Sequence, residues 1–194
     1  MSTIAVVYGG QGRYNEAEDL WIVVRETRKR VLGEEHPDTL TSMSNFVSEY
    51  LNQGRIEEAE KLATQVTEIR KRVLGQDHPH TLQSLDNLAS ICRDQGRWRE
   101  AEEQEINVLE TRQRVIGPDH PDTLTSMNNL AWTYNKQGHI DQAIVLMEQV
   151  VVLRFEKLGK EHPHTIGSVN ALAEWRQFRD STSFKLYDSL RSQR

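Results

Sequence analysis

The sequence predicts an all-α fold, a solenoid of antiparallel helix hairpins, and three regularities predict it. The dipeptide His-Pro occurs at residues 36–37, 78–79, 120–121 and 162–163, always 42 residues apart. Glycine recurs with the same period, both shortly before each His-Pro and midway between them. Between these points the apolar residues step by three or four, as one buried face of an α-helix requires. A fixed period of this length with two turns per unit indicates stacked helix pairs.

The longer helix of each unit, helix B, is predicted from an apolar face that begins acidic and ends basic, which complements the helix dipole. In the second unit this face consists of Ile56, Ala59, Leu62, Ala63, Val66, Ile69 and Val73. One alanine per unit marks a close helix crossing, where a larger side chain would not fit: Ala17, Ala59, Ala101 and Ala143. One arginine per unit is interpreted as pairing or capping a helix end, with ligand contact as the alternative: Arg28, Arg70, Arg112 and Arg154.

The shorter helix, helix A, follows each His-Pro. Its apolar face in the third unit includes Leu82, Leu85 and Leu88. Proline suits a first helical turn because its missing N–H would be unbonded there in any case. The flanking histidine or the following Asp or Thr is expected to cap the helix. Glycines such as Gly54 and Gly96 suit the left-handed residue that ends a helix, so each unit should be an antiparallel hairpin.

Both ends of the chain depart from the repeat. Alignment of Gly12 with Gly138 leaves the first unit with about half of its helix A. The residues after 178 diverge, and we interpret them as a short cap helix over the last unit. The predicted segments are units at about 1–33, 34–75, 76–117 and 118–159, a lone helix A at 163–178, and the divergent segment 179–194.

Composition excludes several classes of function. The net charge of −5 with interleaved signs leaves no basic stripe for nucleic acid. No apolar stretch is long enough to cross a membrane. A single cysteine, Cys92, and the lack of any Asn-x-Ser/Thr acceptor favour a reducing, cytoplasmic location.

Chemistry at a metal or a nucleophile is also not expected. The recurring histidines fall one per unit, and packed helices lie about 8–10 Å apart, whereas zinc needs its nitrogen ligands at about 2.1 Å. Cys92 takes the place of Tyr50 and Tyr134 on an apolar face, which suits a core residue better than a nucleophile. The sequence therefore predicts no catalytic residues, no metal site and no cofactor.

The segment LDNLASICRDQGRWREAE, with Leu88, Ala89, Gly96, Trp98 and Ala101 at their present spacing, resembles a tetratricopeptide motif. The 42-residue form with Gly-x-x-His-Pro most resembles the repeats of kinesin light chains. The resemblance covers residues 1–178 and implies a right-handed superhelical solenoid whose A helices line the concave surface. Similar arrays form the sensing ends of large nucleotide-switch receptors.

The candidate binding site is therefore the concave face of the A helices, which is polar and rich in amides. Asn45, Asn87 and Asn129 form a ladder with one amide per unit, and each amide could bond both the N–H and the C=O of an extended peptide. The alternative is that these amides bond neighbouring helices and fix the stacking. Trp132 adds an amphipathic surface of the kind enriched at binding hot spots, or else packs against the next helix. The predicted peptide-binding residues are Asn45, Ser48, Asp86, Asn87, Ser90, Arg93, Asn128, Asn129, Trp132 and Lys136.

The function predicted from these features is a non-catalytic scaffold that binds an extended peptide or partner segment in the concave groove. Arg93 and Lys136 suggest a ligand with some acidic character. The alternative function is the ligand-sensing section of a larger nucleotide-switch receptor whose ATPase lies outside this chain. A third expectation is end-to-end self-association through residues 1–11, which contain the apolar run of Ile4, Val6, Val7 and Tyr8.

Overall fold

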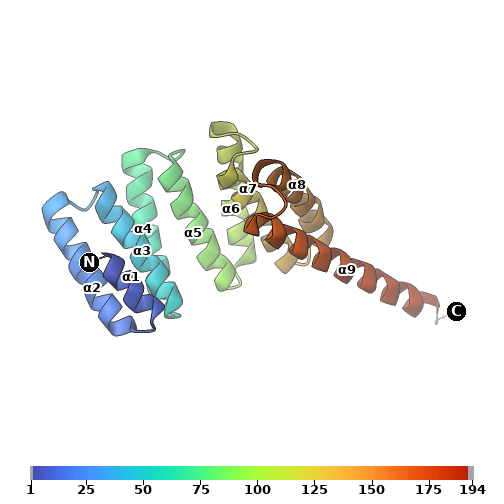
Figure 1. Cartoon of the computed structure of the whole chain (residues 1–194), viewed down its shortest axis with the longest axis horizontal. Coiled ribbons are helices and arrows are strands. Elements are labelled where there is room, and N and C mark those ends of the chain that lie inside the picture. The colour runs from blue at the N-terminus through green and yellow to red at the C-terminus, as the bar shows by residue number, and fades with distance from the viewer. Residues whose placement is uncertain (1, 192–194) are drawn as a thin grey trace. The chain divides into compact units, whose positions relative to one another are not determined.

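The computed structural model describes the backbone of residues 2–191, and within this range nine helices and no strand occur. The prediction of an all-α fold is confirmed. The chain divides into two compact units, Met1–Arg97 and Trp98–Arg194, and the described residues of each are treated separately below. Unit 1 holds α1 (Ser2–Gly10), α2 (Tyr14–Leu32), α3 (Pro37–Asn52), α4 (Ile56–Leu74) and α5 (Pro79–Asp94) (Figure 1). Unit 2 holds α6 (Trp98–Val115), α7 (Pro121–Lys136), α8 (Ile140–Leu158) and α9 (Pro163–Arg191).

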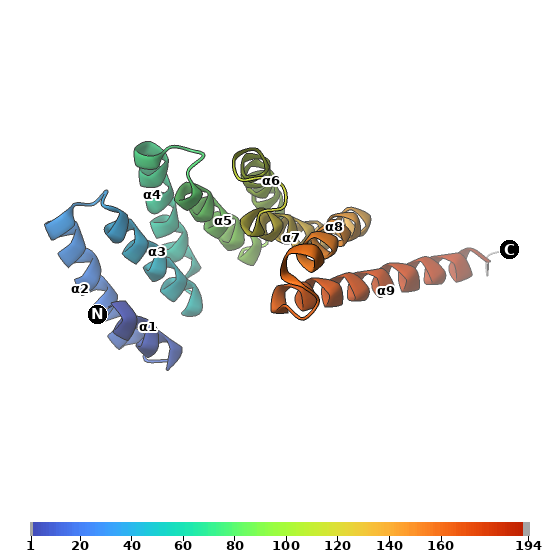
Figure 2. The same ribbon diagram turned by 45° about the horizontal axis from the view of Figure 1, so that its top comes forward.

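Each unit has its own hydrophobic core. In unit 1 the pairs α1–α2 and α3–α4 are hairpins, and α5 packs against α4. Unit 2 places α6 against α7, pairs α7 with α8 in a hairpin, and packs α9 against α8 (Figure 2). The alanines predicted at the helix crossings, Ala17, Ala59, Ala101 and Ala143, are completely buried.

A histidine caps the start of the A helices. The backbone of His36, His78 and His120 is extended, and proline follows each as the first helical residue. The Nδ1 atom of His78 accepts a hydrogen bond from the N–H of His80 at 3.2 Å. Equivalent bonds form at His36, His120 and His162. Of the predicted capping residues, the histidine therefore satisfies one of the unbonded N–H groups of the first turn.

The turn inside each hairpin depends on a left-handed glycine. Gly54 has a φ of 73° and Gly96 has the same value, a region that residues with a Cβ atom avoid. The next N–H then bonds back to the carbonyl five residues earlier, as from Arg55 to Tyr50 at 2.9 Å and from Arg97 to Cys92 at 2.8 Å. This closure satisfies carbonyls at the end of helix A and reverses the chain within three residues.

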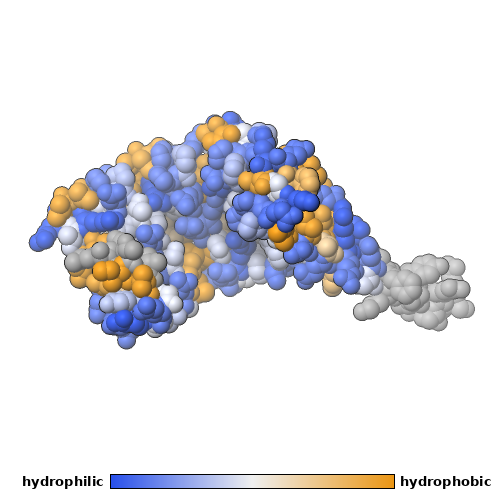
Figure 3. Space-filling model, in the orientation of Figure 1, coloured by the Kyte–Doolittle hydropathy of each residue, from blue (hydrophilic) through white to orange (hydrophobic). Residues whose placement is uncertain are grey.

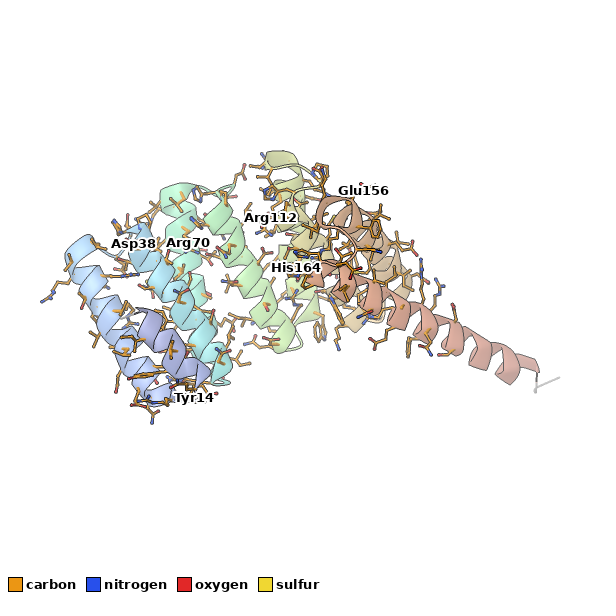
Figure 4. The ribbon with its side chains drawn as sticks, in the orientation of Figure 1. Tyr14, Asp38, Arg70, Arg112, Glu156 and His164 are labelled. Carbon is orange, nitrogen blue, oxygen red and sulfur yellow. The ribbon has the colours of Figure 1, made fainter. Side chains whose placement is uncertain are left out.

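An arginine joins each helix B to the next helix A; Arg70, Arg112 and Arg154 are buried there, whereas the half-buried Arg28 donates to the carbonyl of Asp38 at 2.7 Å. In unit 1, Arg70 on α4 donates from Nη1 to the backbone carbonyl of His80 at 3.2 Å and to Ser84 Oγ at 2.6 Å. Its side chain lies where α4 and α5 meet (Figure 4). In unit 2, Arg154 binds His164 and Ser168 in the same way. Arg112 repeats the contact with Asp122 and Ser126. We call this contact between an arginine of helix B and the carbonyl and serine of the next helix A the arginine staple.

A second polar contact links consecutive hairpins at the opposite end of the helices. Glu60, near the start of α4, accepts hydrogen bonds from Gln95 at 2.8 Å and from Arg97 at 2.6 Å. Glu18 receives Arg55 in the same place one repeat earlier, and Glu102 receives Gln137 in unit 2. The two contacts together fix both ends of α3, α5 and α7 against the preceding helix B.

The last helix differs from its prediction. A lone helix A was expected to end at residue 178, with a separate cap helix after it. Instead α9 continues without a break to Arg191. The physical reason is visible in the sequence, because the position of the turn glycine Gly138 is occupied by Asp180 and no Gly or Pro occurs between residues 179 and 191. Nothing there supplies a left-handed residue to end the helix.

None of the helices that the structure describes combines the length and the apolar character that crossing a membrane requires.

The arginine staple should be a main source of stability within each unit. Replacing Arg70 with Met keeps most of the buried stem but removes the donor to His80 and Ser84. We expect this change to lower the free energy of unfolding by about 1–3 kcal/mol, because a buried carbonyl loses its partner. Chemical denaturation monitored by circular dichroism measures the free energy of unfolding of the variant and of wild type.

Arg72→Met is the matched control, because Arg72 pairs with Glu35 through a side chain that is 65% exposed. An exposed ion pair contributes about 0–1 kcal/mol. Equal losses in the two variants would contradict the staple's importance.

Candidate functional site

The three ladder amides occupy the same position in successive A helices. Asn45 lies on α3 and is exposed, whereas Asn87 on α5 is half-buried. Asn129 lies on α7 in unit 2 and is also half-buried. The ladder thus falls partly in unit 1 and partly in unit 2. It does not continue into α9, where the equivalent residue is Ala171.

These amides are not used by the fold within the described residues. The side chains of Asn45, Asn87 and Asn129 make no hydrogen bond to the part of the chain that the structure describes. The alternative that the ladder fixes the stacking has no such bond to support it, and the binding role stays a prediction.

Asn128, next to the ladder, behaves differently. Its Oδ1 accepts hydrogen bonds from Arg154 Nη1 at 3.2 Å and from Ser168 Oγ at 3.3 Å. The amide therefore joins the arginine staple and holds α7 to α8 and α9. This geometry gives Asn128 a packing role, although its sequence neighbour Asn129 carries the same chemical group.

Trp132 packs against the next helix and also remains partly exposed. Its ring meets the ring of Trp175 on α9 edge to face, with centroids 4.9 Å apart and planes at 84°. Trp175 is buried at 3% exposure, whereas Trp132 remains 37% exposed. One part of the Trp132 ring therefore packs against the next helix, and the rest is available to a ligand.

The charged and hydroxyl residues of the predicted site are spread over α3, α5 and α7. Lys136 is exposed and makes no ion pair with a described residue. Asp86, Ser90 and Arg93 are half-buried on α5, and Ser48 is exposed on α3.

The recurring arginines make hydrogen bonds within the fold, which favours the structural role over the alternative of ligand contact. Arg70, Arg112 and Arg154 are buried, and each binds a carbonyl and a serine of the next helix. Burial lowers the pKa of the Arg70 and Arg154 guanidinium groups from their ordinary value, because desolvation disfavours the charged form. The predicted pairing or end-capping is therefore what these side chains do.

Other chemistry finds little support in the described residues. No three His, Cys, Asp or Glu side chains of that part gather as a metal site would require. Cys92 is buried at its apolar position.

A hollow of about 400 Å³ on α7 and α8 includes Tyr134 and Val145 in its lining but none of the predicted binding residues. Desolvation, with Glu102 and Glu105 nearby, raises the pKa of Tyr134.

Sequence reasoning missed two buried carboxyl groups of the described residues, Glu49 and Glu105. Glu105 on α6 is almost fully buried and accepts a hydrogen bond from Thr133 on α7 at 2.7 Å. The equivalent positions are Ala63 and Met147, so a charged residue at an apolar repeat position was the signal that could have found it. The pair adds a polar contact to the interface of α6 and α7.

The segment predicted to self-associate is partly exposed. Ile4 is 50% and Val7 49% exposed on α1, while Tyr8 stacks under the Arg13 guanidinium. Hydrophobic surface is visible over α1 (Figure 3). The side chain of Val6 lies outside the described residues. End-to-end association through residues 1–11 stays a prediction.

Comparison with known proteins gives consistent results. A family model for the tetratricopeptide repeat matches residues 1–72, 48–105 and 106–154. No curated protein matches the chain. Among solved structures, the nearly identical TPR-like repeats assigned to a kinesin light chain of Podosopora anserina are 30% identical with a TM-score of 0.77, covering 98% of this chain and 92% of that one. A single-residue variant of those repeats has the same identity and a TM-score of 0.79, covering 98% of this chain and 91% of that one.

A more distant structure shows the fold alone. BtubC (BKLC) of P. vanneervenii is 20% identical with a TM-score of 0.72, covering 92% of this chain and 79% of that one. The repeated helical hairpin is therefore shared well beyond close sequence similarity.

The ring contact of Trp132 with Trp175 should contribute measurably to unit 2. Edge-to-face pairs contribute about 0.5–1.5 kcal/mol beyond area burial. We expect Trp132→Ala to lower the free energy of unfolding by at least that amount and Trp132→Phe, which keeps a ring, to recover part of it. Denaturation curves for the two variants measure this, and equal stability of wild type and Trp132→Ala would contradict the packing role.

Proposed function

The chain belongs to the tetratricopeptide repeat family, with repeats of the kinesin light chain-like kind, and we propose that it is a scaffold that binds an extended peptide along its A helices. Repeat proteins of this family are in general non-catalytic protein-interaction modules. The finer proposal concerns which residues bind and what they recognise. The single observation that carries it is the ladder of amides that make no hydrogen bond to the described residues.

An amide ladder suits main-chain recognition. Each asparagine side chain offers two N–H donors and one carbonyl acceptor, which can pair with the C=O and N–H of one peptide residue. Asn45 and Asn87 occur 42 residues apart at the same place in α3 and α5, so they present the same pair of groups in successive repeats. A ligand held in this way would be recognised as an extended backbone more than as a sequence.

The anchor and the charge preference would come from α7. Trp132 keeps 37% of its surface exposed beside Asn129, and aromatic side chains of this kind often carry much of the binding energy at interfaces. Lys136 follows one helical turn later and would favour an acidic side chain in the ligand. We therefore propose that the ligand is a peptide with acidic residues, which the ladder amides bind and Trp132 anchors. We place the protein in the reducing environment of the cytoplasm.

The alternative function, a sensing section of a larger nucleotide-switch receptor, stays a prediction. A receptor of this kind would bind its ligand on the same surface. The two functions differ in whether an ATPase domain is joined to, or assembled with, the repeat array. A phosphate-binding loop in the same gene product would favour it.

The binding proposal is tested by replacing Asn87, Asn129 and Trp132 together with alanine. The probe is an array of acidic extended peptides, each also made with an N-methylated backbone. Wild type should bind the plain peptides, and the triple variant should bind them at least tenfold more weakly, about 1.4 kcal/mol. N-methylation should cause a comparable loss, because it removes the backbone donors.

Asn107→Ala is the matched control, because Asn107 is an exposed asparagine on helix B rather than helix A. Its affinity should equal that of wild type. Unchanged affinity in the triple variant, or equal binding of N-methylated peptides, would show that the ladder is not the binding surface.

A further inference from the structure

The last helix presents an apolar face that the A helices of complete hairpins bury. Ile166 and Val169 on α9 are each 43% exposed, whereas the equivalent Leu124 and Met127 on α7 are 1% and 4% exposed. In α7 the second helix of the hairpin, α8, lies against this face. No described helix takes that place beside α9. Hydrophobic surface is visible over the start of α9 (Figure 3).

The exposed face belongs to a helix that is nearly twice as long as the other A helices. α9 has 29 residues and α7 has 16. At 1.5 Å per residue α9 is about 43 Å long, and both views show its C-terminal half extending past α8 (Figures 1 and 2). With 3.6 residues per turn, positions 166, 169, 173 and 180 fall on one stripe of this helix. In the sequence, apolar residues recur at 184, 187 and 190 in its continuation.

The charges in the middle of α9 are arranged for pairing with a second copy. If two α9 helices lie antiparallel with residue 178 at the two-fold axis, position 176 faces position 180 of the other helix. Arg176 would then meet Asp180 of a second copy, and the symmetry makes this contact twice. In the same register position 169 faces 187, and position 166 faces 190. In these two pairs an apolar position faces an apolar position, and in the central pair opposite charges face each other.

Both residues of the central pair lie in the described part of α9 and are accessible. The side chain of Arg176 is 50% exposed while it bonds Glu148 on α8 at 2.6 Å. Asp180 contacts its neighbour Arg179 with a side chain that is 69% exposed. These surface contacts leave room for a further partner and contribute little by themselves.

From these features we propose that α9 is an interface for a second copy of this chain. The two α9 helices pair antiparallel about residue 178, so that residues 179–191 of each copy cover the face that includes Ile166, Val169 and Ala173 of the other. Each copy supplies the helix that completes the other's last hairpin. The interface is isologous, because the same surface is used on both copies. It lies on a different helix from the peptide-binding residues and from residues 1–11.

The oligomeric state tests the proposal. Light scattering of the full chain should give twice the 22.4 kDa chain mass, and Val169→Glu should weaken dimerisation at least tenfold, because it puts a charge into the apolar interface. The matched control is Val73→Glu on α4, since Val73 is 44% exposed and Val169 is 43% exposed. The control should remain dimeric, and circular dichroism should show the same helix content in all three proteins.

A monomeric wild type, or a Val169→Glu variant that dimerises as well as Val73→Glu, would overturn the proposal. Loss of association in Ile4→Glu but not in Val169→Glu would instead assign the contact to residues 1–11 and overturn it as well.

The register has its own test. The double variant Val169→Cys with Tyr187→Cys should form disulfides between chains under mild oxidation, because the two positions face each other across the pair. Neither single variant should do so, because position 169 of one copy lies about 27 Å along the axis from position 169 of the other, and a disulfide needs Cα atoms within about 7 Å. No cross-link in the double variant, or an equal one in a single variant, would overturn the antiparallel pairing.

Discussion

The arginine staple is the contact on which the rest of the structure depends. A guanidinium at the end of helix B reaches the carbonyl ten residues later, as from Arg70 to His80, and the serine fourteen residues later at Ser84. The interval contains the glycine, the histidine cap and the proline that start the next helix. Because the arginine bonds a fixed position of the following helix, the number of residues between the two helices is constrained. Each helix A therefore packs against the preceding helix B in a similar way.

Other polar groups of the A helices have no part in the staple. Ser84 and Ser168, which packing buries, pair with it. The ladder amides lie three residues after the serines at this position, as Asn87 does after Ser84, so they occupy a neighbouring part of the same helix surface. They make no hydrogen bond to the described residues, so the fold does not use their donors and acceptors there.

The fold could be predicted because its determinants are local and repeated: proline and glycine at fixed places, small alanines at the crossings, and apolar residues at helical spacing. The site could be predicted only in outline. Asn128 and Asn129 look alike in the sequence, and only three-dimensional packing shows that Asn128 meets Arg154 while its neighbour does not. The length of α9 was missed because the repeat pattern ends before the helix does, although the lack of Gly and Pro after residue 178 was visible.

One comparison tests most directly the claim that packing and recognition use different amides. Asn128→Ala removes the acceptor of Arg154 and Ser168, so the free energy of unfolding should fall by about 1–3 kcal/mol. Asn129→Ala, one residue away on the same helix, should stay within about 0.5 kcal/mol of wild type. Denaturant unfolding of the two variants under identical conditions decides the matter. Equal losses, or a larger loss for Asn129→Ala, would contradict the account.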